Sequence, residues 1–328
     1  MLLKLVKKKL KKIKRKRNKN MNKIKKLILD IKKIKIQGAT NVCLATLEIL
    51  KLTAKQNKNL PLKQFLKKTK NIAEKASLIR ATEPMAQNAV KYVFFKLKNS
   101  SIKDTETALK LINKYSDEFV KTLKKNKQVL FKKGINIVKK QDKVFTHCHS
   151  SAVENILIGS KNKKIKVFNT ETRPLFQGRT TAQKLTKAGI NTTMLVDSAA
   201  DFFISKHSGK HLMMDKIIIG CDSISWDGSI VNKIGSYGIA LAAKYNKVPL
   251  YIAGNLFKVD SDNIVDIEIR EDSEVWQKRD QKHFDIINFA FDYVPAEFIT
   301  GIICEFGILK PKDIKKTVLK HYPWLIKK

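Results

Sequence analysis

The feature that most constrains the fold is an alternation of short apolar runs and helix-like segments that begins after Gly134. Strand and helix alternating at this spacing are typical of a doubly wound parallel sheet. Ligands bind beyond the carboxyl ends of the strands in such a sheet, so the residues after each run are candidates for a site. The predicted strands are Lys143–Thr146, Lys164–Phe168, Thr193–Val196, Lys216–Ile219 and Val248–Ile252, and the predicted helices are roughly Ala152–Ile158, Thr181–Ala188, Ser198–Ile204 and Ile234–Tyr245.

The preceding part of the chain has a helical pattern. From Thr40 to about Lys133 apolar residues recur at helical spacing, and no glycine stands between Gly38 and Gly134. We therefore expect an α/β protein in which an N-terminal bundle of four or five helices precedes a Rossmann-like doubly wound sheet. The expected division is a basic extension over residues 1–20, a helical domain over 21–135 and an α/β domain over 136–328.

The basic charge of the chain lies mostly in its N-terminal part. The sequence has 67 Lys or Arg against 29 Asp or Glu, a formal net charge of +38. Residues 1–140 hold 40 basic and 8 acidic side chains, and residues 141–328 hold 27 and 21, so the two parts carry +32 and +6. Abundant Lys beside abundant Ile and Asn is what an AT-rich genome encodes on any solvated surface. We favour this interpretation over a nucleic-acid-binding surface.

Two subsets of the basic residues need separate treatment. Residues 1–20 contain eleven Lys or Arg and no acidic residue. This run is a disordered arm, a basic amphipathic helix or sequence upstream of a start at Met21, and no function is assigned to it. Arginine is rare, with seven residues in the chain, and a planar guanidinium binds phosphate in a way that an ammonium group does not reproduce.

The cysteines and the hydropathy indicate a reducing compartment and no membrane span. The four cysteines are scattered, without a C-x-x-C pair, which argues against a zinc site or a disulfide framework. No stretch approaches 18 uncharged apolar residues, so no transmembrane helix is expected. We therefore expect a cytoplasmic protein.

The first predicted strand is followed by the segment Thr146-His-Cys-His-Ser-Ser-Ala152. A Cys followed by hydroxyl residues that open a helix is a candidate reactive site, because a helix N-terminus lowers the pKa of a thiol and favours bound phosphate. An inert buried Cys148 between hydrogen-bonded His147 and His149 explains the motif equally well. A metal site made by these three residues is disfavoured, since adjacent residues point in different directions.

Polar residues also follow the other predicted strands. After the second strand, Glu171 and Arg173 could pair and hold a loop, and Gly178 would let backbone approach. A structural loop and a binding loop explain this segment equally well. The convergence of such residues on one sheet edge favours a functional interpretation over a surface one. The remaining candidates are Asp222 after the fourth strand, where a catalytic carboxylate would lie, Asn232 and Lys233 ahead of a helix, where they would bind phosphate, and Lys258 after the fifth strand.

These segments resemble the translation initiation factor 2B alpha/beta/delta-subunit family, whose archaeal relatives include ribose-1,5-bisphosphate isomerase and 5-methylthioribose-1-phosphate isomerase. The resemblance covers roughly Ile34 to Pro311. Since the family contains both enzymes and regulatory subunits, membership alone does not decide the function. The motifs that carry it are Ile36-Gln-Gly-Ala-Thr40, Arg80-Ala-Thr-Glu-Pro84, Thr146-His-Cys-His-Ser150, Glu171-Thr-Arg-Pro174, Gln177-Gly-Arg179, Val196-Asp-Ser-Ala199, Gly220-Cys-Asp-Ser223, Asp227-Gly-Ser229, Asn232-Lys-Ile-Gly235 and Ala290-Phe-Asp-Tyr-Val-Pro-Ala296.

The resemblance implies a catalytic pair. In the isomerases a Cys and an Asp carry the chemistry, and those positions match Cys148 and Asp222. Asp222 would protonate the ring oxygen or the developing oxyanion, and the Cys148 thiolate would remove the proton from C2. Arg80 and Lys258 would hold phosphate groups, and no metal or cofactor is required. The implied substrate-binding residues are Gln37, Gly38, Ala39, Thr40, Arg80, Ser150, Ser151, Ala152, Asn232, Lys233 and Lys258.

Three segments differ from the ribose-bisphosphate isomerase pattern. Those enzymes have Arg-Gly-Ala-Gly, His-Ser-Lys and Pro-Thr-Ala-Val where this chain has Gln37-Gly-Ala-Thr40, His149-Ser-Ser151 and Ala81-Thr-Glu-Pro84. Two cations are thereby lost and one carboxylate is gained near the expected bisphosphate site. The alternative function is therefore a regulatory initiation-factor-2B-like subunit that binds translation initiation factor 2. A methylthioribose-phosphate isomerase is a weaker alternative.

The favoured function is isomerisation of a phosphorylated pentose, ribose 1,5-bisphosphate, to ribulose 1,5-bisphosphate in nucleotide salvage. The family further implies AMP as an effector and a homodimer or hexamer assembled through the sheet domain. The apolar stretch Phe298–Leu309 offers material for such an interface.

Overall fold

The structure, a computed structural model, describes residues 20–209, 212–261, 267–277 and 284–326. It divides into two compact units, the first ending at Thr122 and the second beginning at Leu123. The division falls inside helix α5 (Thr105–Ile137), whereas the sequence-based boundary at residue 135 falls near the end of that helix. Of the basic extension expected over residues 1–20, all but the last residue lies outside the described residues.

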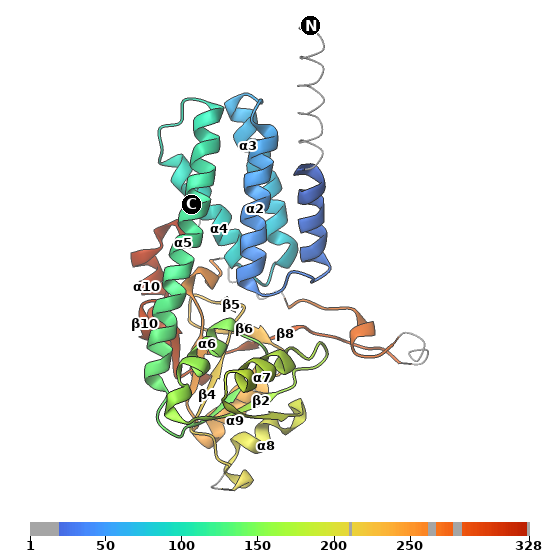
Figure 1. The fold of residues 1–328 in the computed structure, drawn as a ribbon, viewed down its shortest axis with the longest axis vertical. Coiled ribbons are helices and arrows are strands. Elements are labelled where there is room, and N and C mark those ends of the chain that lie inside the picture. The colour runs from blue at the N-terminus through green and yellow to red at the C-terminus, as the bar shows by residue number, and fades with distance from the viewer. Residues whose placement is uncertain (1–19, 210–211, 262–266, 278–283, 327–328) are drawn as a thin grey trace. The chain divides into compact units, whose positions relative to one another are not determined.

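The first unit is helical, as the sequence predicts. Residues 20–32 form a helix, followed by α2 (Ala39–Asn57), α3 (Leu62–Ser77), α4 (Met85–Lys98) and the first part of α5 (Figure 1). In α3 the side chains of Phe65, Thr69 and Ala73, four residues apart, are buried, so one face of an amphipathic helix covers the core. α2 packs against both α3 and α4.

The second unit is built on a seven-stranded sheet with the order β10-β9-β7-β4-β1-β2-β3. Neighbouring strands are parallel except for β10, which pairs antiparallel with β9 at one edge. From the inner strand β1 the chain moves outward to β3 and then returns to β4 on the other side, which confirms a doubly wound sheet. The strands are β1 (Lys143–Thr146), β2 (Lys166–Thr170), β3 (Asn191–Leu195), β4 (Lys216–Ile219), β7 (Leu250–Ala253), β9 (Gly301–Cys304) and β10 (Gly307–Leu309).

Helices connect the strands of this sheet and bury its faces. Val144 of β1, Val167 of β2 and Ile218 of β4 belong to one hydrophobic core with Ile156 and Leu185 from two of these helices. The five predicted strands and four predicted helices of this region all overlap elements of the structure. The connecting helices are α6 (Ser151–Gly159), α7 (Gln177–Lys187), α8 (Ala200–Ile204) and α9 (Ser236–Asn246) (Figure 1).

A second, three-stranded sheet was not predicted. It has the order β5-β6-β8, made by β5 (Ser223–Ile224), β6 (Ile230–Lys233) and β8 (Phe291–Val294), with antiparallel pairing throughout. β5 begins four residues after β4 ends, so this small sheet continues from the carboxyl edge of the large one. The residues Asn232 and Lys233, expected ahead of a helix, therefore end a strand, and α9 begins three residues later.

The C-terminal apolar stretch serves the interior of the second unit. β9 is buried and pairs with β7 and β10. The apolar side chains of β9 within Phe298–Leu309 are therefore covered by the chain's own sheet and its neighbours. The prediction that this stretch supplies an interface is wrong for β9, because its side chains are already covered. Ile308 on the edge strand β10 stays 44% exposed. The helix α10 (Ile314–His321) follows.

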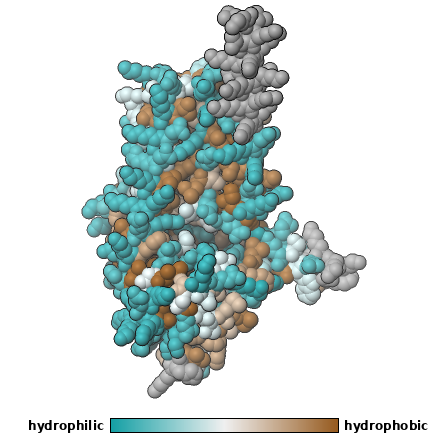
Figure 2. Space-filling view, viewed as in Figure 1, coloured by the Kyte–Doolittle hydropathy of each residue, from teal (hydrophilic) through white to brown (hydrophobic). Residues whose placement is uncertain are grey.

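The surface is rich in charged side chains. Hydrophilic residues cover much of the visible face, with smaller apolar areas between them (Figure 2). Among the described residues, no helix has both the length and the apolar character needed to cross a membrane.

Candidate active site

Polar residues follow successive strands of the large sheet at one edge. Cys148 comes after β1, Thr172 after β2, Asp197 after β3, Asp222 after β4 and Lys258 after β7. Because the carboxyl ends of parallel strands share an edge, these residues gather there. The pKa of the Cys148 thiol is affected by three nearby charges. Asp222 and Asp197 raise it, and Lys233, the last residue of β6, lowers it.

Cys148 has a backbone conformation that side-chain-bearing residues rarely adopt. Its φ is +66° and that of Thr172 is +64°, both in the left-handed region. The N–H of Cys148 donates to Oγ1 of Thr172 (3.0 Å), and its carbonyl accepts from Oγ1 of Thr181 (2.8 Å). Strained backbone held by such bonds is a feature of functional sites, because the surrounding structure must keep it in place.

Asp197 holds the loop that contacts Cys148. Its two carboxylate oxygens accept the N–H groups of Thr172 (2.7 Å) and Arg173 (2.6 Å), which fixes the left-handed turn after β2. Asp197 belongs to one of the family motifs, but no role was predicted for it from the sequence. The signal was its position directly after a predicted strand, the same signal that selected Asp222.

His147 is neutral and structural. Its Nε2 lies 2.9 Å from the carbonyl oxygen of Ile234, which can only accept, so Nε2 carries the proton. Nδ1 then accepts from the hydroxyl of Thr170 at 2.6 Å. Burial lowers the pKa of His147 to about 4, and the positive charge of Lys233 lowers it further. The side chain therefore ties β1 to β2 and to the turn after β6 without titrating near neutrality.

The Cys148 thiol is protonated in the ligand-free site. Burial raises its pKa to about 11, and the charges of Asp222 and Asp197 add to the effect, while Lys233 and the backbone N–H of His149 oppose it. The expectation that the helix N-terminus lowers this pKa is therefore wrong. Cys148 stands three residues before the first residue of α6, and desolvation outweighs the helix there.

Asp222 and Lys258 are linked through the main chain of Cys221. The N–H of Asp222 donates to the carbonyl of Val231 (2.8 Å), which joins the end of β4 to β6. Nζ of Lys258 donates to the carbonyl oxygen of Cys221. Gly254 packs on the other side, since a Cβ there would lie 2.4 Å from the Cys221 sulfur. Lys258 thus contacts the residue that directly precedes Asp222.

The two residues that end β6 contribute in different ways. Nζ of Lys233 lies 4.7 Å from the centroid of the Phe291 ring, and its charge lowers the pKa of Cys148. Nδ2 of Asn232 donates to Oγ of Ser236 (2.8 Å), the first residue of α9. Lys233 is therefore the cation that shares the edge with the thiol, whereas Asn232 stabilises the turn.

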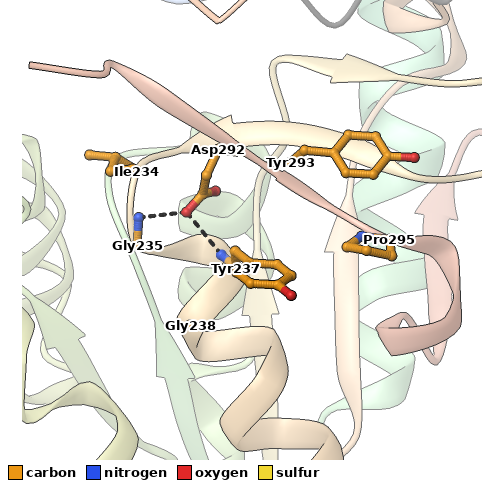
Figure 3. A pocket seen from close by; sticks show the side chains of 7 residues that line it. All are labelled: Ile234, Gly235, Tyr237, Gly238, Asp292, Tyr293 and Pro295. Atoms are coloured by element: carbon orange, nitrogen blue, oxygen red, sulfur yellow. Dashed lines mark hydrogen bonds between the residues drawn. The ribbon is translucent and has the colours of Figure 1, made fainter.

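A cavity of about 640 Å³ opens beside this turn (Figure 3). Oδ2 of Asp292 accepts the N–H groups of Gly235 (2.7 Å) and Tyr237 (3.0 Å), and burial raises the pKa of Asp292 to about 6. None of the predicted substrate ligands lines it. Asp292 also belongs to a family motif, and no role was predicted for it from the sequence. The lining residues are Ile234, Gly235, Tyr237, Gly238, Asp292, Tyr293 and Pro295.

The segment Ser150–Ala152 opens α6 close to β4. A Cβ on Gly220 would lie 2.7 Å from Oγ of Ser150, so glycine at the end of β4 makes room for the start of the helix. The first N–H groups of a helix have no partner inside it and attract anions. The phosphate-binding role of this segment stays a prediction.

The loop after β2 is held differently from the prediction. Glu171 pairs with Arg179 (2.9 Å) and not with Arg173, whose Nη2 donates to the carbonyl of Val275 (2.9 Å). The Phe176 ring lies under both guanidinium groups, at 3.6 Å from Cζ of Arg179 and 5.1 Å from Cζ of Arg173. Gly178 is required, because a Cβ there would lie 1.8 Å from the carbonyl oxygen of Thr170.

The remaining predicted ligands belong to the first unit. Arg80 is buried, and its Nη2 lies 3.1 Å from Oε1 of Glu83, the carboxylate that replaces an uncharged residue of the isomerase pattern. Gln37 and Gly38 precede α2, and Ala39 and Thr40 are its first residues. The φ of Gly38 is +79°, and the Gln37 carbonyl accepts Nδ2 of Asn41 at 2.9 Å.

Comparison with known proteins decides the family. Residues 35–311 match the initiation factor 2 subunit family, well over half of the chain. The chain belongs to this family. Within it, a protein of Methanocaldococcus jannaschii named ribose 1,5-bisphosphate isomerase is 34% identical over 94% of this chain and 98% of its own length.

Other members with different names are also similar. A methylthioribose-1-phosphate isomerase of Desulforamulus reducens is 28% identical over 86% of this chain and 85% of its own length. The crystal structure of a Pyrococcus horikoshii protein titled translation initiation factor eIF-2B has a TM-score of 0.72 at 23% identity, covering 88% of this chain and 97% of that one. The last likeness confirms the initiation factor 2 subunit fold and, at that identity, nothing more.

Proposed function

We propose that this member of the family is a cofactor-independent aldose–ketose isomerase that converts ribose 1,5-bisphosphate to ribulose 1,5-bisphosphate. The observation that carries the proposal is the placement of Cys148 after β1 and of Asp222 after the neighbouring strand β4, at one carboxyl edge of the sheet. The 34% identity with a protein named ribose 1,5-bisphosphate isomerase, over nearly the whole chain, supports this choice of substrate.

The reaction needs two proton transfers that a thiol and a carboxyl group can share. In the reactive form the proton of the resting Cys148 thiol lies on Asp222. Asp222 gives this proton to the ring oxygen as the bond from that oxygen to C1 breaks, and the Cys148 thiolate takes the proton from C2. The product of this step is an enol with a double bond between C1 and C2. Cys148 then returns its proton to C1, and the C2 hydroxyl returns its proton to Asp222. The ketone forms and both side chains regain their starting states.

The resting protonation of Cys148 sets the strength of this base. A group with a pKa of about 11 is scarce as its anion at neutral pH but accepts a carbon-bound proton readily once ionised. Lys233 is the cation that favours the ionised form in the free site. We assign Lys233 this second role beside phosphate binding.

Phosphate groups require cationic anchors and helix N-termini. Lys258, Lys233 and the start of α6 at Ser151 lie on the second unit and supply one group of donors. For Arg80, a phosphate contact is proposed from the family resemblance. Its ion pair with Glu83 lowers the net positive charge that it offers to an anion, so we expect weaker phosphate binding than an arginine without that ion pair would give.

The decisive experiment is a turnover assay with purified protein and ribose 1,5-bisphosphate, with and without AMP, in which ribulose 1,5-bisphosphate is measured. We expect turnover, and rates reduced at least about 10²-fold in Cys148→Ser and Asp222→Asn, the usual effect of removing a positioned acid or base. Cys43→Ser and Asp285→Asn, which lie outside the proposed site, serve as matched controls and should retain activity.

Two other outcomes would redirect the proposal. Turnover of 5-methylthioribose 1-phosphate alone would keep the catalytic pair and change the substrate, as the similarity to methylthioribose-1-phosphate isomerases allows. A folded protein without turnover of any sugar 1-phosphate would overturn the enzyme proposal. The pairing of Arg80 with Glu83 would then favour a regulatory subunit that binds translation initiation factor 2.

Assembly and regulation follow from the same proposal. We expect a homodimer or hexamer, a role in nucleotide salvage in the cytoplasm and activation by AMP. Oligomers occur among the solved structures of similar fold, such as one titled a tetrameric eIF2B complex of beta and delta subunits from C. thermophilum. Light scattering of the purified protein tests the first of these expectations, and the AMP arm of the turnover assay tests the last.

A further inference from the structure

Glu305 is a buried carboxylate for which the proposed reaction has no direct use. It follows β9 directly and is 8% exposed. Its two oxygens accept the N–H of Leu256 (3.3 and 3.2 Å), and Oε1 also accepts the hydroxyl of Tyr322 (2.8 Å) and Nδ2 of Asn126 (3.4 Å). Each of these donors is uncharged. A carboxylate buried among neutral donors is costly to keep, which calls for a function beyond packing.

The Leu256 N–H connects this carboxylate to the proposed site. Leu256 is the first residue of the single turn Leu256–Lys258, which follows β7. Oδ1 of Asn255 accepts the N–H of Phe257 (2.9 Å) and closes the start of the turn. At its end, Nζ of Lys258 donates to the carbonyl of Cys221, the residue before Asp222. Glu305 thus holds one end of a three-residue turn whose other end carries a predicted phosphate ligand.

We propose that Glu305 is a positioning residue: through the Leu256 N–H, its carboxylate fixes the turn that directs Lys258 toward a phosphate of the substrate. The inference rests on the proposed function, which assigns Lys258 that phosphate. Glu305 is a positioning and not a catalytic residue because it is buried and its oxygens are already used by protein donors. The Tyr322 ring, whose hydroxyl donates to it, packs against Phe257 at 4.8 Å between centroids.

The charge of Glu305 varies near neutral pH. Burial raises the pKa of Glu305 to about 7, while the bonds from Tyr322 and Leu256 favour its ionised form. The groups that face it stay neutral there, since burial raises the pKa of Cys304 to about 12 and that of Tyr322 higher still, and the Asn126 amide does not titrate. The ionised form accepts the Leu256 N–H more strongly than the neutral acid. Phosphate binding should therefore weaken as pH falls below 7.

The test compares the wild type with Glu305→Gln, which keeps the shape of the neutral acid. At pH 8 we expect KM for ribose 1,5-bisphosphate to rise about tenfold in the variant, the effect of losing one charge-assisted hydrogen bond, with kcat within about twofold. At pH 5.5 the two KM values should converge, because the wild-type carboxylate is then protonated. The substrate phosphates also titrate near pH 6, but they affect both proteins equally, so the ratio of KM values isolates Glu305.

A double-mutant cycle shows whether Glu305 acts through Lys258. Lys258→Met should raise KM on its own, and adding Glu305→Gln should then change KM by less than about twofold, since the two changes remove the same contact. Glu297→Gln, an exposed glutamate of the same unit, is the matched control and should behave as wild type. Thermal unfolding of each variant checks that the fold is retained.

The outcomes separate this inference from the proposed function. Dissociation constants for ribose 1,5-bisphosphate measured by calorimetry in the Cys148→Ser background give the same comparison without turnover. Absence of turnover with intact binding would overturn the isomerase and leave the comparison readable. A wild-type KM or dissociation constant for Glu305→Gln at pH 8, or a full additional loss in the Lys258→Met background, would overturn the role of Glu305. The role of Glu305 is also overturned if no binding of ribose 1,5-bisphosphate is detected.

Discussion

Two loops at the same sheet edge are held in place by different means. The backbone of Cys148 is in the left-handed region and is held by hydroxyl groups of Thr172 and Thr181, with neutral His147 beside it. The turn that ends at Lys258 has ordinary backbone angles and is held through Leu256 by the buried carboxylate of Glu305. The Cys148 backbone is held directly by hydroxyl groups, with the Asp197 carboxylate acting one contact further away, whereas the turn at Lys258 is held directly by a carboxylate.

The two loops have different tasks in the proposed reaction, proton transfer at Cys148 and phosphate binding at Lys258. A proton-transferring group must keep its geometry at every pH, and uncharged hydrogen bonds do not change with pH between about 5 and 9. A phosphate anchor tolerates adjustment, since a lysine ammonium group is a point charge on a flexible chain. We therefore expect changes near Cys148 to reduce kcat and changes near Lys258 to raise KM.

The largest expected effect concerns the catalytic pair. Cys148→Ser and Asp222→Asn should each lower kcat at least about 10²-fold while KM changes less than about threefold, because both act on the reacting atoms. Steady-state kinetics on ribose 1,5-bisphosphate measure the two parameters separately. A variant that lost activity through KM alone would contradict the contrast between the two loops.

The pH dependence of the rate should reveal the resting thiol. The reactive form, Cys148 thiolate with protonated Asp222, carries as many protons as the resting thiol and carboxylate, so kcat should stay nearly constant from pH 7 to 10 and fall as the pH passes the thiol pKa of about 11. Initial rates at saturating substrate in a series of buffers test this. A rise of about tenfold per pH unit over that range would show that the thiolate acts without a protonated partner.

A smaller effect is expected from the carboxylate that supports Cys148 indirectly. Asp197→Asn replaces one anionic acceptor of the N–H groups of Thr172 and Arg173 with an amide, and should lower kcat about tenfold. The free energy of unfolding should fall by about 1 kcal/mol, measured by urea denaturation. Asp285→Asn, exposed and distant in sequence, is the control. A rise in KM without loss of kcat would contradict the assignment.

The smallest expected effect concerns the first unit. Glu83→Gln removes the charge that pairs with Arg80, so KM for ribose 1,5-bisphosphate should fall about threefold with kcat unchanged. Glu106→Gln, an exposed glutamate 75% accessible and paired with Lys110, is the control. A higher KM in Glu83→Gln would show that the pair orients Arg80 and does not compete with phosphate.

Much of the large sheet was predictable because its inner strands β1, β2, β4 and β7 are short runs of mostly buried, mostly apolar residues. That pattern located the positions of Cys148, Asp222 and Lys258, whereas the edge strand β3 has mostly exposed side chains. The small sheet was not, since its strands are two to four residues long and mix polar with apolar residues, as in Ile230–Lys233. Short mixed strands carry no periodicity that distinguishes them from loops.

The partners of charged groups were the least predictable part of the site. Glu171 was expected to pair with Arg173, two residues away, but the turn between them directs the carboxylate to Arg179. Likewise the pKa of Cys148 depends on how much protein surrounds the sulfur, which no local pattern encodes. Glu305 was overlooked because β9 was interpreted as surface material and not as a strand with its own carboxyl end.

The protonated state of Cys148 has a consequence for the chemical durability of the protein. With a pKa of about 11, roughly one molecule in 10⁴ carries the thiolate at pH 7, and the thiolate is the form that peroxides and alkylating agents attack. The site should therefore react slowly with iodoacetamide at neutral pH although it contains a partly accessible cysteine. The same burial that makes the sulfur a strong base for its substrate shields it from oxidants.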